Sequence, residues 1–282
     1  MPDMALATLD GTNGRNGGAQ GHNMTCRLVE HVAKAGLVRT FLDVARETGL
    51  DQRTVRRIVA DHIRQLESGF RFETPTWLGL DEIHILGKVC GVVANVEHHC
   101  LVGILPSRDQ DRIGRYIRHM PDTDLIDLVA IDMWRPYKAV VNELLPKAGL
   151  VIDRFHVVRM ANESLDEVRK SVRRELPTKK RLLLKDDRFL LFSRESKLDK
   201  RGRTTVARWT EEFPLLGDAW AAKERFLTIW DTARSSRQAG EMVDAWVAAL
   251  PEALKEPFHP LVRAMGNWRD DILRYFDTPG NS

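Results

Sequence analysis

The order of apolar segments between residues 77 and 153 constrains the fold of this chain more than any other feature. Three short apolar runs with tight connections between them predict an antiparallel meander. Two further runs alternate with helix patterns, which is typical of parallel strands joined by helical crossovers. The expected strands span residues 77–85, 88–96, 100–105, 126–132 and 150–153, and the expected helices 109–120 and 136–145. This order predicts a mixed α/β fold in which the fourth strand lies beside the first.

Two aspartates stand at the ends of apolar runs in this pattern. Asp81 ends the apolar run of the first expected strand and Asp132 ends that of the fourth, where an uncompensated buried charge would be costly. The two carboxylates become neighbours if the first and fourth strands pair. Two carboxylates in one accessible notch offer the oxygen ligands that Mg²⁺ and Mn²⁺ prefer, and a third acid would complete a two-metal site for phosphodiester chemistry. The alternative is that both acids are strand-end or turn residues without a metal.

Composition excludes several classes of function. The chain has 282 residues, and its 43 basic and 40 acidic residues give a net charge of only +3, so any nucleic-acid surface must be local. Its three cysteines, Cys26, Cys90 and Cys100, form neither an even disulfide set nor a zinc pair, which indicates a reducing compartment. No apolar run approaches the ~18 residues of a membrane span. We therefore expect a cytoplasmic protein without a membrane partner.

Residues 40–63 have the spacing of a helix-turn-helix motif. Gly49 suits the turn between two helices, and Asp51 is a good N-cap for the second. The exposed side chains at the start of that second helix would reach phosphates and base edges in a major groove. These candidate DNA-binding residues are Gln52, Arg53, Thr54, Arg56 and Arg57. The alternative is an ordinary helical hairpin with a solvated basic face.

The remaining chain is expected to be mostly helical. Helix patterns cover residues 160–175, 219–233, 241–250 and 268–276, with aromatic residues at core spacing. Basic residues and two phenylalanines alternate between residues 179 and 203, a composition that could follow a DNA backbone. The favoured reading of that stretch is a solvated helix face and a flexible loop over residues 199–203. Residues 1–24, rich in glycine and asparagine, are expected to form a disordered leader.

Four sequence blocks, in their order, resemble the ISL3 family of insertion-sequence transposases. They are Gly79-Leu-Asp-Glu82, Ile131-Asp-Met-Trp-Arg-Pro-Tyr137, Leu144-Leu-Pro-Lys-Ala148 and Ile152-Asp-Arg-Phe-His-Val-Val158. The resemblance implies a DDE transposase that cuts element ends and joins them to target DNA with Mg²⁺ (or Mn²⁺). It also implies a ribonuclease-H-like sheet interrupted by an all-helical insertion and preceded by a helix-turn-helix domain. By resemblance, Asp81 and Asp132 are the first two catalytic acids and metal ligands.

Two further residues belong to the last of these blocks, and their roles stay open. Asp153 is either an acid that supports the metal ligands or the N-cap of the following helix. His156 either orients a scissile phosphate or a carboxylate near the metal, or caps the junction between strand and helix. Glu241 is an obvious third acid by residue type, but the resemblance places it on an insertion helix, and it is rejected.

The resemblance also brings expectations about the ends of the chain. In the family the third acid is a glutamate that follows the last helix, and no residue of this chain matches it. A zinc ribbon before the helix-turn-helix is missing as well. We therefore expect a product shortened at both ends and catalytically inactive. The alternatives are a DNA-binding remnant that occupies or inhibits element ends, and a different metal nuclease that uses Glu82 or Asp153.

The expected organisation and partners follow from these readings. The partner is double-stranded DNA of element ends and target, on which the protein is expected to be nucleoid-associated and to form a homo-oligomer. The expected domains are a leader (1–24), a helix-turn-helix domain (25–70), the first part of the catalytic core (71–176), a helical insertion (177–276) and a tail (277–282).

Overall fold

A computed structural model describes residues 24–69 and 73–278 of the chain. The expected leader, except its last residue, and the last four residues of the expected tail lie outside these described residues. The chain divides into two compact units, Met1–Glu73 and Thr74–Ser282. Each unit has its own core and is described by itself.

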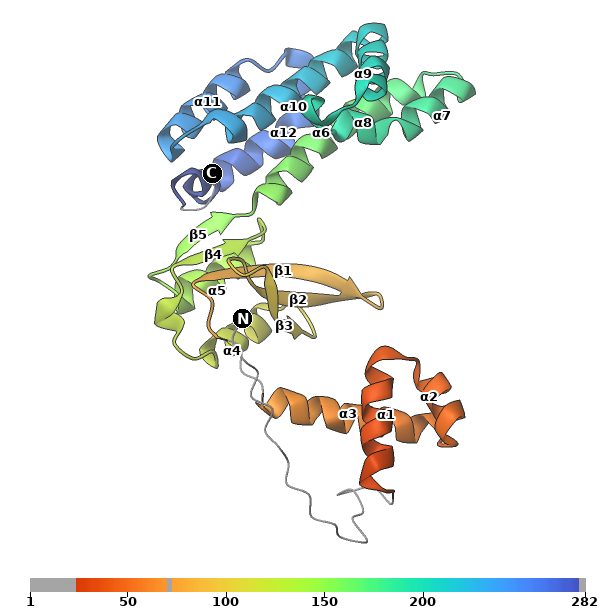
Figure 1. Ribbon diagram of the computed structural model, residues 1–282. Coiled ribbons are helices and arrows are strands. Elements are labelled where there is room, and N and C mark those ends of the chain that lie inside the picture. The colour runs from red at the N-terminus through yellow and green to blue at the C-terminus, as the bar shows by residue number, and fades with distance from the viewer. Residues whose placement is uncertain (1–23, 70–72, 279–282) are drawn as a thin grey trace. The chain divides into compact units, whose positions relative to one another are not determined.

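The N-terminal unit consists of three helices, α1 (Cys26–Val38), α2 (Phe41–Thr48) and α3 (Gln52–Gly69) (Figure 1). Its core consists of small aliphatic side chains contributed by all three helices. The fully buried members are Val32, Ala33, Val44, Ala45, Val55, Ile58 and Val59. Threonines cap the first two helices, because the hydroxyl oxygens of Thr25 and Thr40 accept hydrogen bonds from Leu28 N and Asp43 N.

The connection between α2 and α3 depends on two residues. Gly49 has φ +69°, in the left-handed region that a side chain disfavours. Asp51 caps α3, because one carboxylate oxygen accepts a hydrogen bond from Thr54 N at 3.0 Å and the other from the Thr54 hydroxyl. The turn and the cap together fix the direction in which α3 leaves α2.

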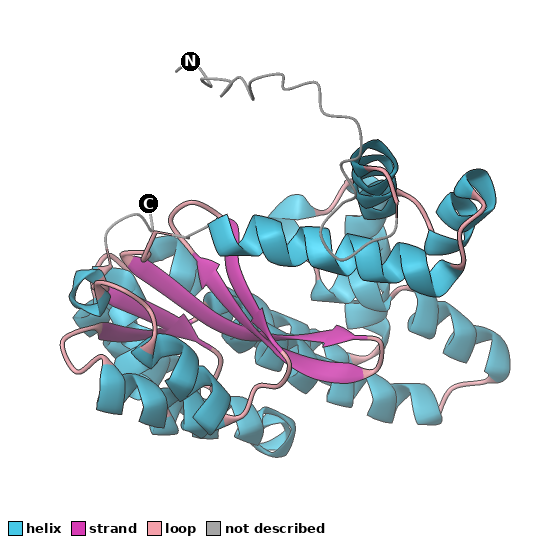
Figure 2. Ribbon diagram, turned by 90° about the horizontal axis from the view of Figure 1, so that it is seen from below, coloured by secondary structure: helices cyan, strands magenta, loops and turns pink. Residues whose placement is uncertain are grey.

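The second unit contains one five-stranded sheet, whose strands are drawn in magenta in Figure 2. Its strands are β1 (Trp77–Ile85), β2 (Lys88–Asn95), β3 (Cys100–Leu105), β4 (Leu128–Ile131) and β5 (Gly149–Ile152). Their order is β3-β2-β1-β4-β5; β1, β2 and β3 are antiparallel neighbours, whereas β4 and β5 run parallel to β1. The predicted mixed α/β class and the pairing of the fourth strand with the first are confirmed.

Two helices join the strands of the parallel half. They are α4 (Gln110–Arg118) and α5 (Arg135–Leu144), and a short turn of helix, η1 (Thr123–Leu125), precedes β4. One face of the sheet packs into the core through Leu78, Leu80, Val129 and Ile131. β1 and β2 extend past the other strands as a hairpin arm (Figure 1).

The rest of the second unit is helical. It comprises α6 (Arg154–Arg174), α7 (Thr178–Asp186), α8 (Arg188–Phe192), η2 (Glu195–Lys197), α9 (Lys200–Glu212), α10 (Pro214–Thr232), α11 (Ser236–Ala248), α12 (Glu252–Asn267), α13 (Arg269–Leu273) and η3 (Arg274–Asp277). The long helix α6 starts at the sheet and packs against α10 and α12 (Figure 1). The ring of Trp246 lies 4.7 Å from that of Phe226 and 6.0 Å from that of Phe258. Of the aromatic residues predicted to form a helical core, Phe226, Trp230 and Trp246 are buried there, and Trp220 is half-buried.

The structure corrects two helix starts and adds one helix that was not predicted. The expected flexible loop over 199–203 is instead the first turn of α9, where Asp199 caps Gly202 N at 2.7 Å. Helix α6 begins at Arg154, before the start at residue 160 that periodicity indicated. Helix α12 was missed because it contains Pro257 and Pro260, each of which normally frees a carbonyl one turn earlier. Those carbonyls belong to exposed residues, which leaves them accessible to water.

Within the described residues, no helix is both long enough and apolar enough to cross a membrane.

Candidate metal centre at the carboxyl edge of the sheet

Three aspartates stand in one row across three neighbouring strands. In the parallel pairing Leu80 lies opposite Ile131, and Ile131 opposite Ile152. Asp81, Asp132 and Asp153 are the next residues. Because adjacent strands lie ~4.8 Å apart, the three Cα positions are close neighbours at the carboxyl edge of the parallel half.

The surroundings of Asp81 differ from the prediction of a buried acid at a strand end. It is the fifth residue of a nine-residue strand, and its side chain is 53% exposed, so it neither ends a strand nor lies buried. β1 continues because it still pairs with β2, where Asp81 lies opposite Val92. What ends at Leu80 is the pairing with β4. Asp132 does follow the end of its strand, and it is half-buried.

Burial and like charge act on Asp132. Burial is the main reason that the pKa of its carboxyl is raised, and the charge of Asp81 raises it further. His156, Arg108 and the hydrogen bond that Trp134 N donates to Asp132 Oδ1 at 3.2 Å oppose this shift. An ionised Asp132 is therefore under-compensated, and a cation beside it would relieve the imbalance.

Neighbouring backbone and hydroxyl groups hold Asp81 in place. Its Oδ1 accepts a hydrogen bond from Glu82 N at 2.7 Å. The Tyr137 hydroxyl, from the first turn of α5, donates to the Asp81 carbonyl oxygen at 3.2 Å. Burial raises the pKa of Tyr137, so the phenol stays protonated as a donor. The contact links the start of α5 to the strand position that carries the first acid.

The structure gives different surroundings to Asp153 and His156. Asp153 Oδ1 accepts a hydrogen bond from Phe155 N at 2.8 Å, the geometry of an N-cap of α6. His156 is 6% exposed, and its Nε2 lies 3.9 Å from Asp81 Oδ1. Its Nδ1 is buried without a hydrogen-bond partner in the part of the chain that the structure describes. These contacts favour a capping role for Asp153 and an orienting role for His156.

Sequence reasoning missed one residue beside the acids, Arg108. Its guanidinium pairs with the Glu82 carboxylate and lies over the Trp134 ring, 4.3 Å from the centroid. Glu82, considered as a substitute third acid, is thus engaged by an arginine. The only sequence signal for Arg108 is a basic residue soon after the third strand.

The two acids fit a divalent ion in part. A pocket of about 290 Å³ is lined by Asp81, Asp132, Asp153 and His156, and also by residues of the last described turn, Tyr275 and Thr278. Among residues 24–69 and 73–278, no group of three or more histidines, cysteines or acids is placed to hold a metal. Mg²⁺ is commonly bound by one or two carboxylates together with water and substrate phosphates. Asp81 and Asp132 match that incomplete type of protein ligand set.

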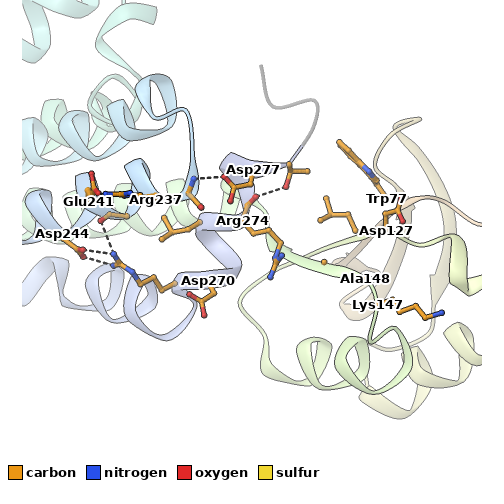
Figure 3. A pocket seen from close by; sticks show the side chains of 17 residues that line it. Trp77, Asp127, Lys147, Ala148, Arg237, Glu241, Asp244, Asp270, Arg274 and Asp277 are labelled. Atoms are coloured by element: carbon orange, nitrogen blue, oxygen red, sulfur yellow. Dashed lines mark hydrogen bonds and ion pairs between the residues drawn. The ribbon is translucent and has the colours of Figure 1, made fainter.

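A larger cavity of about 1030 Å³ lies near the opposite ends of β4 and β5 (Figure 3). Its charges are largely matched, since Arg269 holds both oxygens of Asp244 at 2.8 Å and Arg237 lies 3.0 Å from Glu241. Glu241 borders this cavity and does not line the pocket of Asp81 and Asp132. This placement agrees with its rejection as a third acid.

The candidate DNA-binding residues lie at the start of α3. Gln52, Arg53, Arg56 and Arg57 are exposed, and Arg56 lies 5.8 Å from the centre of the Phe41 ring. Thr54 differs from them, because it is half-buried and its amide and hydroxyl both bond to the capping Asp51. The structure thus presents a cluster of three arginines and a glutamine on one helix end.

Three of the basic residues between 179 and 203 form contacts within the protein. Arg194 pairs with Glu224 at 2.9 Å and also with Asp231, both on α10. Lys180 pairs with Glu212, and Arg203 donates to a backbone carbonyl at 2.9 Å. These contacts favour the structural reading of this stretch over a path for DNA.

Comparison with known proteins shows the family of this chain. The family DDE_Tnp_ISL3, described as Transposase, matches residues 78–282, well over half of the chain. The transposase for insertion sequence element IS1001 of Bordetella parapertussis is 26% identical over 196 residues. Those residues are 66% of this chain but 48% of the relative, so the matched part spans about half the length of that curated protein. The chain belongs to the ISL3 family of transposases.

Proposed function

We propose that this chain supplies the DNA-binding and metal-binding parts of a DDE transposase. Asp81 and Asp132 would hold Mg²⁺ or Mn²⁺, and α2 and α3 would form a helix-turn-helix that binds duplex DNA. The observation that carries the proposal is the register of the sheet, which makes the two acids neighbours although 51 residues separate them. Family membership gives these neighbouring acids a reaction, the cleavage and joining of DNA strands.

The sheet order supports a ribonuclease-H-like core. Three antiparallel strands followed by two that run parallel to β1 are the arrangement which the resemblance implies. In this reading α6 leads from the core into an all-helical insertion, and the chain returns to the sheet at η3. Tyr275 and Thr278 border the same pocket as Asp81 and Asp132. This return supports the expectation that the third acid of the family follows the last helix.

The described side chains would divide the work at such a site. A bound divalent ion would polarise the phosphodiester and stabilise the charge that develops on its oxygens. Tyr137 would position the backbone of Asp81 through its hydrogen bond. His156 would orient the Asp81 carboxylate, which lies 3.9 Å away. Asp153 would fix the start of α6 and with it the position of His156.

Binding of Mn²⁺ to the full chain, measured by electron paramagnetic resonance, tests the metal site. We expect Asp81→Asn and Asp132→Asn each to weaken Mn²⁺ binding by ~10-fold or more, because each variant removes a charged ligand. Asp127→Asn is the matched control, an exposed aspartate at the opposite end of β4. Equal Mn²⁺ affinity in all four proteins would contradict the proposed ligands.

Duplex DNA binding tests the helix-turn-helix. We expect Arg53→Ala combined with Arg57→Ala to lower the affinity for duplex DNA and to flatten its dependence on salt. Arg27→Ala combined with Arg46→Ala is the control, since it removes two exposed arginines from α1 and α2 of the same unit. If both double variants bind like the parent, the assignment of α3 as the recognition helix is wrong.

One observation favours a second candidate, an end-binding protein that does not cut DNA. In the described part of the chain no third acid joins Asp81 and Asp132 in a group placed to hold a metal; Asp153 caps α6 and Glu82 pairs with Arg108. A polypeptide of these 282 residues would then retain DNA fragments without nicking them. Mg²⁺-dependent cleavage that disappears in Asp81→Asn would eliminate this candidate.

A further inference from the structure

A groove of about 500 Å³ adjoins the pocket of the two acids. Residues from four regions line it: the connection before α4, the end of β4, helix α6 and helix α12. Asp132 and His156 line both the groove and the pocket that contains Asp81. The groove is therefore continuous with the candidate metal centre, and the helical region forms one of its walls.

The groove has an excess of basic side chains. Arg108, Arg159, His259 and Arg263, here called the basic groove residues, line it together with His156, against the acids Asp132 and Glu163. They come from three separate elements, so no single stretch of sequence shows the cluster.

Two of the basic groove residues are exposed and unpaired. Neither His259 nor Arg263, both on α12, has an ion-pair partner among the described residues. Arg159 lies 3.6 Å from Glu163, but the two side chains are 55% and 66% exposed, and such surface pairs contribute little. Arg159 and Arg263 can thus turn to another anion at small cost.

The remaining member is held more firmly. Arg108 is fixed between the Glu82 carboxylate and the face of Trp134. Trp134 itself packs edge-on to Tyr137, whose hydroxyl bonds to the backbone of Asp81. The position of this guanidinium is therefore tied to that of the first acid, as expected for a group that positions a substrate.

We propose that the basic groove holds the phosphate backbone of the DNA strand presented to Asp81 and Asp132. Arg159 on α6 and Arg263 on α12 contact successive phosphates, and Arg108 contacts the phosphate nearest the acids. This inference rests on the proposed function, and it assigns to the helical region a direct part in holding substrate. Guanidinium groups suit that task because they bind phosphate oxygens in a bidentate way.

Arginine modification by phenylglyoxal, read by mass spectrometry, tests the contact directly. The full chain is modified with and without a fluorescein-labelled duplex of about three helical turns (~30 bp). We expect DNA to slow modification of Arg159 and Arg263 several-fold. Arg112 and Arg225, exposed arginines on α4 and α10 that do not line the groove, should react at the same rate in both states.

The salt dependence of binding to the same duplex provides a second readout. Arg159→Ala combined with Arg263→Ala should reduce the slope of log affinity against log salt by about 2, or about one for each phosphate that is no longer neutralised. Arg159→Lys combined with Arg263→Lys should retain most of the salt slope, because the positive charge remains at both positions. Arg112→Ala combined with Arg225→Ala should bind like the parent.

The outcomes separate this inference from the proposed function. If the parent binds DNA through α3 while Arg159 and Arg263 react equally fast with and without DNA, the groove assignment is wrong and the helix-turn-helix stands. An unchanged salt slope in the double alanine variant would likewise overturn the groove. If the parent does not bind the duplex even at low salt, both proposals fail.

Discussion

The contact between Gly36 and Val59 gives the sharpest test of packing in the N-terminal unit. Gly36 lies on α1, and a Cβ atom built there would be 2.3 Å from Val59 Cγ2 on α3, far inside any real contact. Replacing glycine by alanine favours a helix by ~1 kcal/mol. Forcing an extra methyl group into a packed core costs about 1–3 kcal/mol. The difference between these two terms is a net destabilisation of the three-helix unit by up to about 2 kcal/mol in Gly36→Ala.

Hydrogen exchange read by mass spectrometry can measure this change locally. All seven tryptophans lie after residue 73, so their fluorescence reports on the second unit alone. Amide exchange in α1 and α3 should become about tenfold faster for each ~1.4 kcal/mol lost. Gly266→Ala in α12 is the matched control, because a Cβ atom there meets nothing within 4 Å. That variant should slow exchange in α12, since it gains helix propensity without a clash.

A double-mutant cycle identifies the cause. Val59→Ala removes the methyl group that the new Cβ would strike, so Gly36→Ala in that background should stabilise α1 by ~1 kcal/mol. The expected coupling between the two sites is about 1–3 kcal/mol, the difference between the effects of Gly36→Ala in the two backgrounds. If Gly36→Ala is as harmful in the Val59→Ala background as in the parent, steric conflict with this side chain is not the cause, and the packing argument fails.

Three other expectations concern single residues. Burial lowers the pKa of Lys223 from 10.5. Between the lowered pKa and 10.5 the unfolded chain binds more protons than the folded chain, so stability rises with pH in that window. Lys223→Met should remove this rise, which is measured by comparing melting temperatures at about pH 8 and about pH 10. Arg194→Ala should destabilise the second unit by ~1.5–3 kcal/mol in chemical unfolding, because the charged hydrogen bonds of Arg194 to α10 are lost. The control is Lys197→Ala, which should change stability little because Lys197 is exposed and lies outside that network. Gly49→Ala should destabilise the N-terminal unit by ~1–2 kcal/mol, measured by exchange in α2 and α3, because a side chain resists its φ of +69°; unchanged exchange would contradict this.

Local patterns were sufficient to predict most elements of the second unit. Each of the five strands contains an apolar run, and each run is bounded by turn residues or by a change to helical periodicity. The pairing of the fourth strand with the first also followed, because parallel strands require a crossover such as α4 and α5 provide. Helix α12 was not predicted, because its two prolines have a low local preference for helix. The structure tolerates both prolines because the carbonyls that they free belong to exposed residues.

The environment of each acid was harder to predict than its position along the strand. The sequence shows Asp81 after an apolar run, which suggests the end of a buried strand. Its exposure depends on β2, which keeps β1 extended beyond the last residue paired with β4. Which neighbour continues and which stops is a property of the whole sheet. The same limit applies to Arg108, whose contact with Glu82 and Trp134 joins three separate segments.

The basic groove shows why a site can be absent from every local pattern. In the structure, Leu254, Phe258 and Leu261 lie on the buried face of α12, and the opposite face is polar. Arg263 lies on that polar face, 131 residues after Asp132, and nothing nearby in the sequence marks it as different from any surface arginine. It lines the groove only because α12 packs along α6, which itself starts at the carboxyl edge of the sheet. The helical region therefore combines two features that no local pattern separates. The buried faces of its helices build its core, and the direction of α6 places the basic side chains of α6 and α12 near the acids.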